Sequence, residues 1–445
     1  MITLGLDYGT TKNAIVAFDD KQPDKSLHYS QAHHAALTGL PAGHAEQSPA
    51  VVWQSFLDLL AQLPADIRRQ TQAIGLTGQM HSAMLWRDDG AASPVITWQD
   101  RRASADGSLR HFRRISPRLA DGFGFTTLAW LVQNNGLDAW DHAGCPLSWL
   151  ALQLTGEKQP TIDHTFAASW GLWDINRADW DHQAISDLGI PERLLPALVP
   201  PGSLIGHTRN VPGLPDSLPV FAAFGDNQAS VLGTARDLDR EIYLTLGTGA
   251  QLSMVINDKE RQAFPPDWTG EIRPFLNGAF LAVNAPLCGG RAWAWLGEAV
   301  NSILSALSLP TIPEGEILDR LDSLALQAEP NGLVFSPCFL GERGKPDATA
   351  EITGLRLDNF SLSALARSLA QGIVKQLFAP FPEDLRLQRQ LVVGSGNGVR
   401  LCRSIQQEIT SQSGLPLELR QTPEEAATGA ACLAASSLCE NGLGD

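Results

Sequence analysis

The chain has 445 residues, of which 44% are hydrophobic and 18% are charged, a balance that excludes an intrinsically disordered protein. This length exceeds what one ordinary hydrophobic core supports and predicts two large domains. The formal net charge of −15 argues against nucleic acid or an anionic membrane surface as a partner. If such an acidic chain binds a nucleotide, it needs local backbone donors and a metal ion to do so.

The cysteines and the N-terminal residues favour a cytoplasmic location. The six cysteines form no C-x-x-C pair and no cluster with histidine, which favours buried thiols in a reducing environment. The chain starts with an apolar stretch that lacks the basic segment of a secretory signal, and it has no run of about eighteen apolar residues that could span a bilayer. We expect a cytoplasmic monomer or homodimer that acts on small molecules, without a membrane or nucleic acid partner.

The first feature with possible chemistry lies between two predicted strands, residues 2–6 and 13–18. The connecting residues 7–12 carry an acid, a glycine and two threonines. A simple β-hairpin explains the glycine and the strand-forming threonines. A phosphate cradle also explains them, because Gly9 lets the backbone approach an anion, the threonines donate to phosphate oxygens and Asp7 holds a divalent metal. This stretch alone leaves both interpretations open.

Further along, the pattern predicts alternating helices and strands. Ser48 and Pro49 are typical of a helix start, with serine as the N-cap and proline at the first helical position, and an apolar stripe follows through residues 51–63. Residues 73–76 read as a buried strand, and the polar loop 77–82 follows it. The alternation continues to about residue 206.

A Pro/Gly-rich bridge at residues 210–219 predicts a domain boundary, which we place between domains 1–217 and 218–445. Beyond it, residues 243–255 repeat the opening pattern of strand, Gly-Thr turn and strand. Matched hairpins at the head of two halves suggest a duplicated fold. The chain therefore resembles the α/β architecture of two duplicated actin/hexokinase-like (ribonuclease-H-like) domains around a cleft.

Several segments, spread from residue 3 to about residue 435, resemble the FGGY family of carbohydrate kinases and occur in that family's order. They are Leu4–Thr11, similar to a first phosphate loop; Glu46–Pro49, similar to an E-Q-D-P helix start; Gly75–His81, similar to the sugar loop; Asp181–Pro196; Gly225–Asn227; and Gly394–Asn397, similar to an adenosine loop. The resemblance favours the phosphate-loop interpretation of the first turn.

The resemblance also implies a substrate class. Met80-His81 stands where glycerol kinases have Arg-Glu and resembles the ketose kinases instead. Residues 96–101, 121–127 and 340–343 look most like the sedoheptulokinase branch of the family. The implied activity is ATP-dependent phosphorylation of a terminal hydroxyl of a ketose, sedoheptulose giving sedoheptulose 7-phosphate. Alternatives are xylulose or another ketose or polyol as substrate and, from a different class, an actin-like ATPase switch, which would have no need of a sugar loop.

The resemblance implies a role for individual residues as well. Asp226 would be the general base; from the residues alone, Asp226 and Asn227 as caps of a helix that starts there is the simpler interpretation, and the resemblance favours the base. Asp7 would hold Mg²⁺. The residues implied to bind the sugar are Gln79, Met80, His81, Trp98, Asp100, Asp226 and Asn227. The residues implied to bind ATP are Gly9, Thr10, Thr11, Lys12, Gly247, Thr248, Gly249, Gly290, Gly394, Ser395, Gly396 and Asn397.

Two adjacent pairs have no such support. Nothing in the sequence gives Arg101-Arg102 a role in binding. His33-His34 is interpreted as solvated surface.

Overall fold

The computed structural model describes residues 1–341, 345, 347–440 and 442. It contains two compact units, both discontinuous in sequence. Unit 1 comprises Met1–Thr234, Pro274–Asn277 and Thr422–Asp445, and unit 2 comprises Ala235–Arg273 and Gly278–Gln421. These units follow spatial contacts, and the division of the chain at 217/218 stays a prediction. The predicted 340–343 segment lies partly outside the described residues, because Glu342 and Arg343 are not among them.

Unit 1 is built on a 7-stranded sheet. The strand order is β13 (Leu204–His207), β14 (Pro219–Phe221), β5 (Thr71–Gly78), β1 (Ile2–Tyr8), β2 (Lys12–Asp19) and β3 (Leu27–Ala32), with β15 (Phe224–Gly225) also pairing with β5. The first two strands form the predicted antiparallel hairpin, and β1 runs parallel to β5. The predicted strand at residues 73–76 is therefore central in this sheet.

Helices and short strand pairs surround this sheet. Ser48 caps α1 as predicted, because its side chain accepts a hydrogen bond from the backbone N–H of Val51. The helices are α1 (Pro49–Gln62), α2 (Ala65–Gln70), α3 (Arg102–Ala105), α4 (Leu109–Ile115), α5 (Gly124–Gln133), α6 (Pro146–Thr155), α7 (His164–Ser169), α8 (His182–Asp187), α9 (Asp226–Thr234) and α17 (Glu425–Glu440); the short pairs are β4 (Glu46–Gln47) with β7 (Val95–Ile96), β6 (Met84–Trp86) with β8 (His142–Gly144), β9 (Thr161–Asp163) with β12 (Ala197–Val199), and β10 (Trp173–Asp174) with β11 (Asp179–Trp180).

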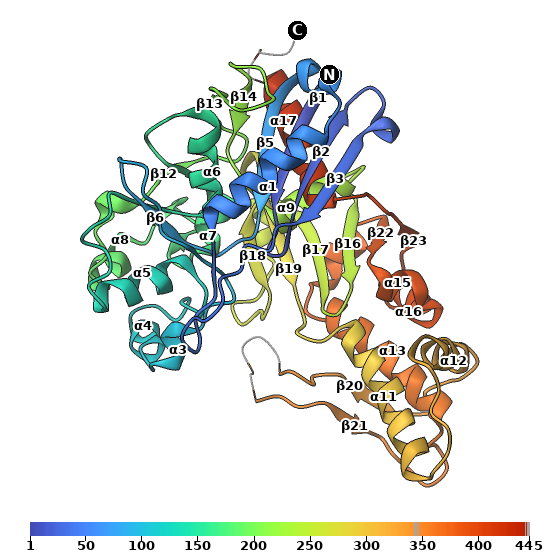
Figure 1. Ribbon diagram of the computed structural model, residues 1–445. Helices are drawn as coiled ribbons and strands as arrows, with labels where there is room; N and C mark the ends of the chain where they lie inside the picture. Colours follow the sequence, from blue (N-terminus) through green and yellow to red (C-terminus); the bar gives the residue numbers. More distant parts are fainter. Residues whose placement is uncertain (342–344, 346, 441, 443–445) are drawn as a thin grey trace. The chain divides into compact units, whose positions relative to one another are not determined.

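The C-terminal helix α17 lies directly on the first sheet, where Figure 1 draws it in red beside the blue β1 and β5. This contact needs glycine in both strands. A Cβ atom at Gly5 would lie 1.8 Å from the carbonyl oxygen of Ala427, and one at Gly75 would lie 2.0 Å from that of Ala430. The small residues of α17 and the strand glycines therefore allow a close backbone approach.

Unit 2 contains a 6-stranded sheet in the order β18 (Glu271–Pro274), β19 (Phe280–Asn284), β17 (Ala250–Ile256), β16 (Glu241–Leu246), β22 (Leu391–Ser395) and β23 (Leu417–Leu419). Its hairpin β16–β17 is antiparallel, and β16 runs parallel to β22. In unit 1, β1 likewise pairs antiparallel with β2 and parallel with β5. The repeated pattern confirms an α/β fold with two sheet-containing domains.

The remaining elements of unit 2 are α10 (Asp258–Arg261), α11 (Gly290–Ala306), α12 (Glu314–Leu326), α13 (Leu362–Phe378), α14 (Glu383–Leu387), α15 (Asn397–Leu401), α16 (Arg403–Ser413) and the antiparallel pair β20 (Val334–Ser336) and β21 (Glu351–Thr353). Helices α11, α12, α13 and α16 pack together beside the sheet. None of the helices in the described part of the chain combines the length and hydrophobicity that crossing a membrane requires.

Candidate functional site

The turn of the first hairpin, residues 9–11, is tied to the loop after β5 by one buried glutamine. The hydroxyl of Tyr8 donates to Gln47 Oε1 (2.8 Å), and Gln79 Nε2 donates to the same oxygen (2.9 Å). Gln47 Nε2 in turn donates to the carbonyl oxygen of Thr10 (2.6 Å). Gln47 thus fixes the turn relative to the predicted sugar loop, a role that its position in the helix-start motif did not reveal.

His33 braces the same turn, so the interpretation of both His33 and His34 as solvated surface is wrong for His33. Its side chain is 6% exposed, whereas His34 is exposed. His33 Nδ1 accepts from the backbone N–H of Ala35 (3.1 Å), so Nε2 carries the proton and donates to the carbonyl oxygen of Gly9 (3.1 Å). Burial lowers the pKa of His33, which agrees with this neutral tautomer.

Asp7 and Asp226 flank β5. Asp7 pairs with Thr77 on one side of the strand, and Phe224 pairs with the same residue on the other side, two positions before Asp226. With neighbouring strands about 4.8 Å apart, the two backbones are separated by roughly 10 Å. The pKa of Asp7 is raised to about 7, chiefly by burial and also by the charges of Asp226 and Glu424, against the opposing effect of Lys12. The carboxylates therefore interact electrostatically across this gap.

The pair of carboxylates is compatible with Mg²⁺. Among the described residues, no group of three or more His, Cys, Asp or Glu side chains could hold a metal ion by itself. Mg²⁺, however, keeps several water ligands and is usually bound through one or two carboxylates plus substrate phosphates. Asp7 supplies one carboxylate of this kind, and its role as the Mg²⁺ ligand stays a prediction.

Lys12, at the end of the first turn, forms a bidentate ion pair in this structure. Its ammonium lies 2.7 and 2.8 Å from the two carboxylate oxygens of Glu424. Half of the Lys12 side chain stays exposed. The residue predicted to contact phosphate is thus held beside the turn by an acid from the segment that leads into α17.

Asp226 begins helix α9 immediately after β15. The backbone N–H of Asn227 donates to Asp226 Oδ1 (2.6 Å), so the side chain does satisfy a donor at the helix start. Gly225 before it is buried, and a Cβ there would lie 2.9 Å from Met80 Cε. The structure thus brings Asp226 next to the predicted sugar loop, where capping and catalysis are compatible roles.

His81 adopts a conformation that non-glycine residues rarely use, with φ of +70°. Two contacts with Ser169 hold it there: the backbone N–H of His81 donates to Ser169 Oγ (3.1 Å), and His81 Nδ1 donates to the Ser169 carbonyl oxygen (2.7 Å). The imidazole stacks on Phe123, with ring centroids 4.5 Å apart and planes inclined by 17°. The predicted sugar loop and the 121–127 segment therefore meet at this ring pair.

Trp98 and Asp100 behave differently from each other. Trp98 is 43% exposed and donates from its indole N–H to Thr10 Oγ1 (2.9 Å), which links a predicted sugar residue to the first turn. Asp100 is buried, and its two oxygens accept from Ala45 N, Arg102 N, Arg102 Nε and Arg102 Nη2 at 2.8–3.0 Å. Arg102 also donates to Glu46 Oε1 (2.6 Å). The lone pairs of Asp100 are thus committed to the protein.

The second turn, residues 247–249, contacts the start of α11. The backbone N–H of Gly290 donates to the carbonyl oxygen of Gly247 (2.9 Å), and that of Arg291 donates to Thr248 O (3.1 Å). A Cβ at Gly290 would lie only 2.4 Å from the Gly247 oxygen. Only glycine lets the helix start approach the turn this closely.

A pocket of about 610 Å³ opens beside this contact in unit 2. Four of the predicted nucleotide residues line it: Gly247, Thr248, Gly290 and Asn397. Gly249, Gly394, Ser395 and Gly396 do not line it; Ser395 Oγ lies 2.9 Å from Thr245 Oγ1 and links β22 to β16. The second turn, α11 and α15 therefore share one concave site.

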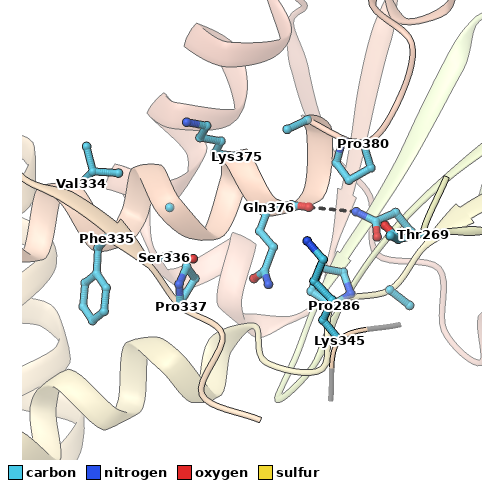
Figure 2. Close-up of a pocket in the computed structure, with 14 residues that line it drawn as sticks. Thr269, Pro286, Val334, Phe335, Ser336, Pro337, Lys345, Lys375, Gln376 and Pro380 are labelled. Carbon is cyan, nitrogen blue, oxygen red and sulfur yellow. Dashed lines mark hydrogen bonds between the residues drawn. The ribbon is translucent and has the colours of Figure 1, made fainter. Parts of the chain in front are cut away.

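Another pocket in unit 2, of about 370 Å³, lies between β20, α13 and the end of β19 (Figure 2). The dashed line in Figure 2 marks the bond from Asn284 Nδ2 to the carbonyl oxygen of Gln376 (2.9 Å). None of the residues predicted to bind sugar, nucleotide or metal lines this pocket. It therefore lies apart from the candidate site.

Comparison with protein families matches both parts of the chain. Residues 2–233 match the N-terminal domain of the FGGY family of carbohydrate kinases, and residues 242–438 match its C-terminal domain. The chain belongs to the FGGY family of carbohydrate kinases. This confirms the family resemblance of the sequence motifs, and the FGGY protein is accordingly an ATP-dependent carbohydrate kinase.

Relatives of this FGGY kinase include the sedoheptulokinase of Homo sapiens, which is 30% identical over 97% of this chain and 96% of its own. A ligand-bound xylulose kinase from Lactobacillus acidophilus superposes with a TM-score of 0.80 at 19% identity, over 99% of this chain and 90% of its own. A glycerol kinase from Plasmodium falciparum, solved with ADP, gives 0.79 at 21% identity, over 98% and 89%. These two structures confirm the fold.

Proposed function

We propose that this FGGY kinase transfers the γ-phosphate of ATP to the terminal hydroxyl of a ketose, with sedoheptulose as the preferred acceptor. The observation that most supports this choice of acceptor is the stacking of His81 on Phe123. The two segments that most resemble ketose kinases and sedoheptulokinases, far apart in sequence, supply the two rings. The near full-length similarity to human sedoheptulokinase points the same way.

In this proposal unit 1 binds the sugar. His81 hydrogen-bonds a sugar hydroxyl, Trp98 presents a flat apolar face, and Gln79, Met80 and Asn227 complete the contacts. We assign Asp100 a positioning role, because its oxygens already accept four hydrogen bonds from the protein and hold Ala45 and Arg102 around the loop.

Asp226 is the proposed general base. Its carboxylate takes the proton of the terminal hydroxyl as the sugar oxygen forms a bond to the γ-phosphorus, while the bond from that phosphorus to the bridging oxygen breaks and ADP leaves. The carboxylate is suited to this because β15 fixes it beside the sugar loop. A base of this kind typically contributes ~10²–10⁴ in rate.

We propose nucleotide contacts for each unit by itself. Backbone and hydroxyl groups of Gly9, Thr10, Thr11, Gly247, Thr248 and Gly249 donate to phosphate oxygens, and Lys12 adds a charge once it leaves Glu424. Gly290, Gly394, Ser395, Gly396 and Asn397 border the adenosine, consistent with the pocket that includes Gly290 and Asn397. Asp7 holds Mg²⁺ through water, and this ion neutralises charge on the phosphates when bound.

The experiment is a panel of sedoheptulose, xylulose, ribulose and glycerol, with ADP release measured by a coupled assay. We expect ADP release to require sugar and kcat/KM to be highest with sedoheptulose. A higher kcat/KM with xylulose or glycerol would contradict sedoheptulose as the preferred acceptor, and ADP release without sugar would favour a switch ATPase.

We keep the prediction of a cytoplasmic monomer or homodimer; the six free cysteines agree with a reducing compartment.

A further inference from the structure

Helix α7 (His164–Ser169) contacts both sides of the candidate site in unit 1, although no motif pointed to it. Its first turn reaches the residue before Asp226, and its last residue holds His81. The motifs that resemble the family left residues 161–170 without a role. The contacts at the two ends of this short helix suggest one.

At the first turn, the hydroxyl of Thr165 links two groups. It accepts from the backbone N–H of Gly225 (2.8 Å) and donates to the carboxylate of Asp163, whose oxygens lie 2.7 and 2.9 Å away. Asp163 also caps the helix by accepting from Phe166 N (2.9 Å). Asp163 and Thr165 are 1% and 0% exposed. Because a buried hydroxyl with both partners in place has one orientation, this link fixes the backbone at Gly225, one residue before Asp226.

At the last turn, Ser169 fixes the backbone and the ring of His81. Its hydroxyl donates to Phe166 O (2.7 Å) and accepts from His81 N (3.1 Å), while its carbonyl oxygen accepts from His81 Nδ1 (2.7 Å). These bonds hold the imidazole orientation and a backbone with φ of +70°. Such a conformation persists only where the surroundings enforce it.

We propose that α7 sets the position of Asp226 relative to His81, and we call it the bracket helix. Thr165 positions the proposed base Asp226, and Ser169 positions the proposed sugar-binding residue His81. About one helix turn separates Thr165 from Ser169. The distance between Asp226 and His81 is therefore expected to stay the same when no substrate is bound. This inference rests on the proposed role of Asp226. It assigns separate kinetic effects to the two ends, which makes it testable.

The first test removes one hydroxyl at each end. Thr165→Val keeps the shape of the side chain, and we expect kcat with the best acceptor of the sugar panel to fall roughly 10–100-fold, because a misplaced catalytic group loses reactivity steeply. The KM for sugar should stay within a few-fold. Thr165→Ser, which restores the hydroxyl, should recover most of the kcat. Ser169→Ala should instead raise the KM for sugar by roughly 5–10-fold, as loss of about one hydrogen bond predicts, with kcat little changed.

A matched control separates position from stability. Thr155, in α6, is another buried threonine whose hydroxyl both donates, to the carbonyl oxygen of Ala151 (2.8 Å), and accepts, from the backbone N–H of Glu157 (3.2 Å). Thr155→Val should lower the melting temperature about as much as Thr165→Val and leave both kinetic constants unchanged. If Thr155→Val lowers kcat to the same degree, the proposal is overturned.

A double-mutant cycle with Asp226→Asn distinguishes failure of this inference from failure of the proposed function. If Thr165 acts through Asp226, the double variant should be no slower than Asp226→Asn alone. Multiplied losses would overturn the role of the bracket helix while leaving Asp226 as base, and a near-normal kcat for Asp226→Asn would overturn the base itself. A normal sugar KM in Ser169→Ala overturns the proposal whether or not Thr165→Val folds.

Discussion

Asp7 and Asp226 lie on opposite sides of β5, where burial and the charge of Asp226 raise the pKa of Asp7 to about 7. Two acids held at this spacing without a cation repel each other and favour a proton on one of them. A divalent ion and its water ligands would relieve that repulsion. This agrees with the proposed role of Asp7 in holding Mg²⁺.

The metal role of Asp7 predicts a selective defect. Asp7→Asn should lower kcat and raise the Mg²⁺ concentration needed for half-maximal activity, because an amide binds Mg²⁺ less well than a carboxylate. Binding of the sugar alone, measured by calorimetry, should be nearly unchanged. An equal loss of sugar binding would instead assign Asp7 to the fold of the hairpin.

The raised pKa of Asp7 also predicts a pH dependence of stability. Between about pH 4 and pH 7 the folded protein retains a proton that the unfolded chain has released, so this group makes folding less favourable as the pH rises, by at most about 1.4 kcal/mol per pH unit. In a chelator and without nucleotide, Asp7→Asn should therefore melt higher than the wild type at pH 8. The difference should shrink at pH 5. A constant difference across this range would contradict the raised pKa.

The bracing of the first turn by His33 can be tested against its neighbour. His33→Asn removes bonds to Gly9 and Ala35 and should cost about 1–3 kcal/mol of stability, because buried groups lose their partners. It should also raise the KM for ATP more than that for sugar. His34→Asn is the control: His34 is exposed with φ of +51°, a conformation that asparagine tolerates, so its melting temperature should barely change. Equal effects of the two would contradict the brace.

Local patterns predicted the hairpins, the Ser48 cap and the central strand because chain neighbours determine them. The position of His33 could not be predicted, since its burial depends on Tyr8 and Gly9 from another part of the sheet. Asp100 was expected to bind the sugar, and that stays a prediction; its ion pair with Arg102 could not be predicted, because it depends on a loop conformation that no spacing encodes. The role of Thr165 in α7 could not be predicted either, because it depends on the packing of α7 against β15.

Two glycines in buried strands could have indicated from the sequence where another segment packs closely. Gly5 and Gly75 interrupt two buried strands, a pattern typical of positions where another backbone approaches closely. The structure places α17 there. Only the three-dimensional fold, however, identifies which distant segment makes the approach.

The second turn yields a prediction for ATP. Gly290→Ala would place a Cβ 2.4 Å from the Gly247 carbonyl oxygen and force the start of α11 away from the turn. We expect the KM for ATP to rise roughly tenfold, equivalent to about 1.4 kcal/mol of lost binding. Sugar affinity, which we assign to unit 1, serves as the internal control and should not change. A normal KM for ATP would remove this contact from the nucleotide site.

The central claim is that Asp226 accepts the proton of the sugar hydroxyl in an ATP-dependent ketose kinase. The most direct measurement is kcat of Asp226→Asn with the best ketose, together with its melting temperature. Asparagine caps a helix as well as aspartate but cannot take the proton, so the account predicts a folded protein with kcat lowered by roughly 10²–10⁴ and nucleotide affinity within a few-fold. A folded Asp226→Asn with near-normal turnover would contradict it.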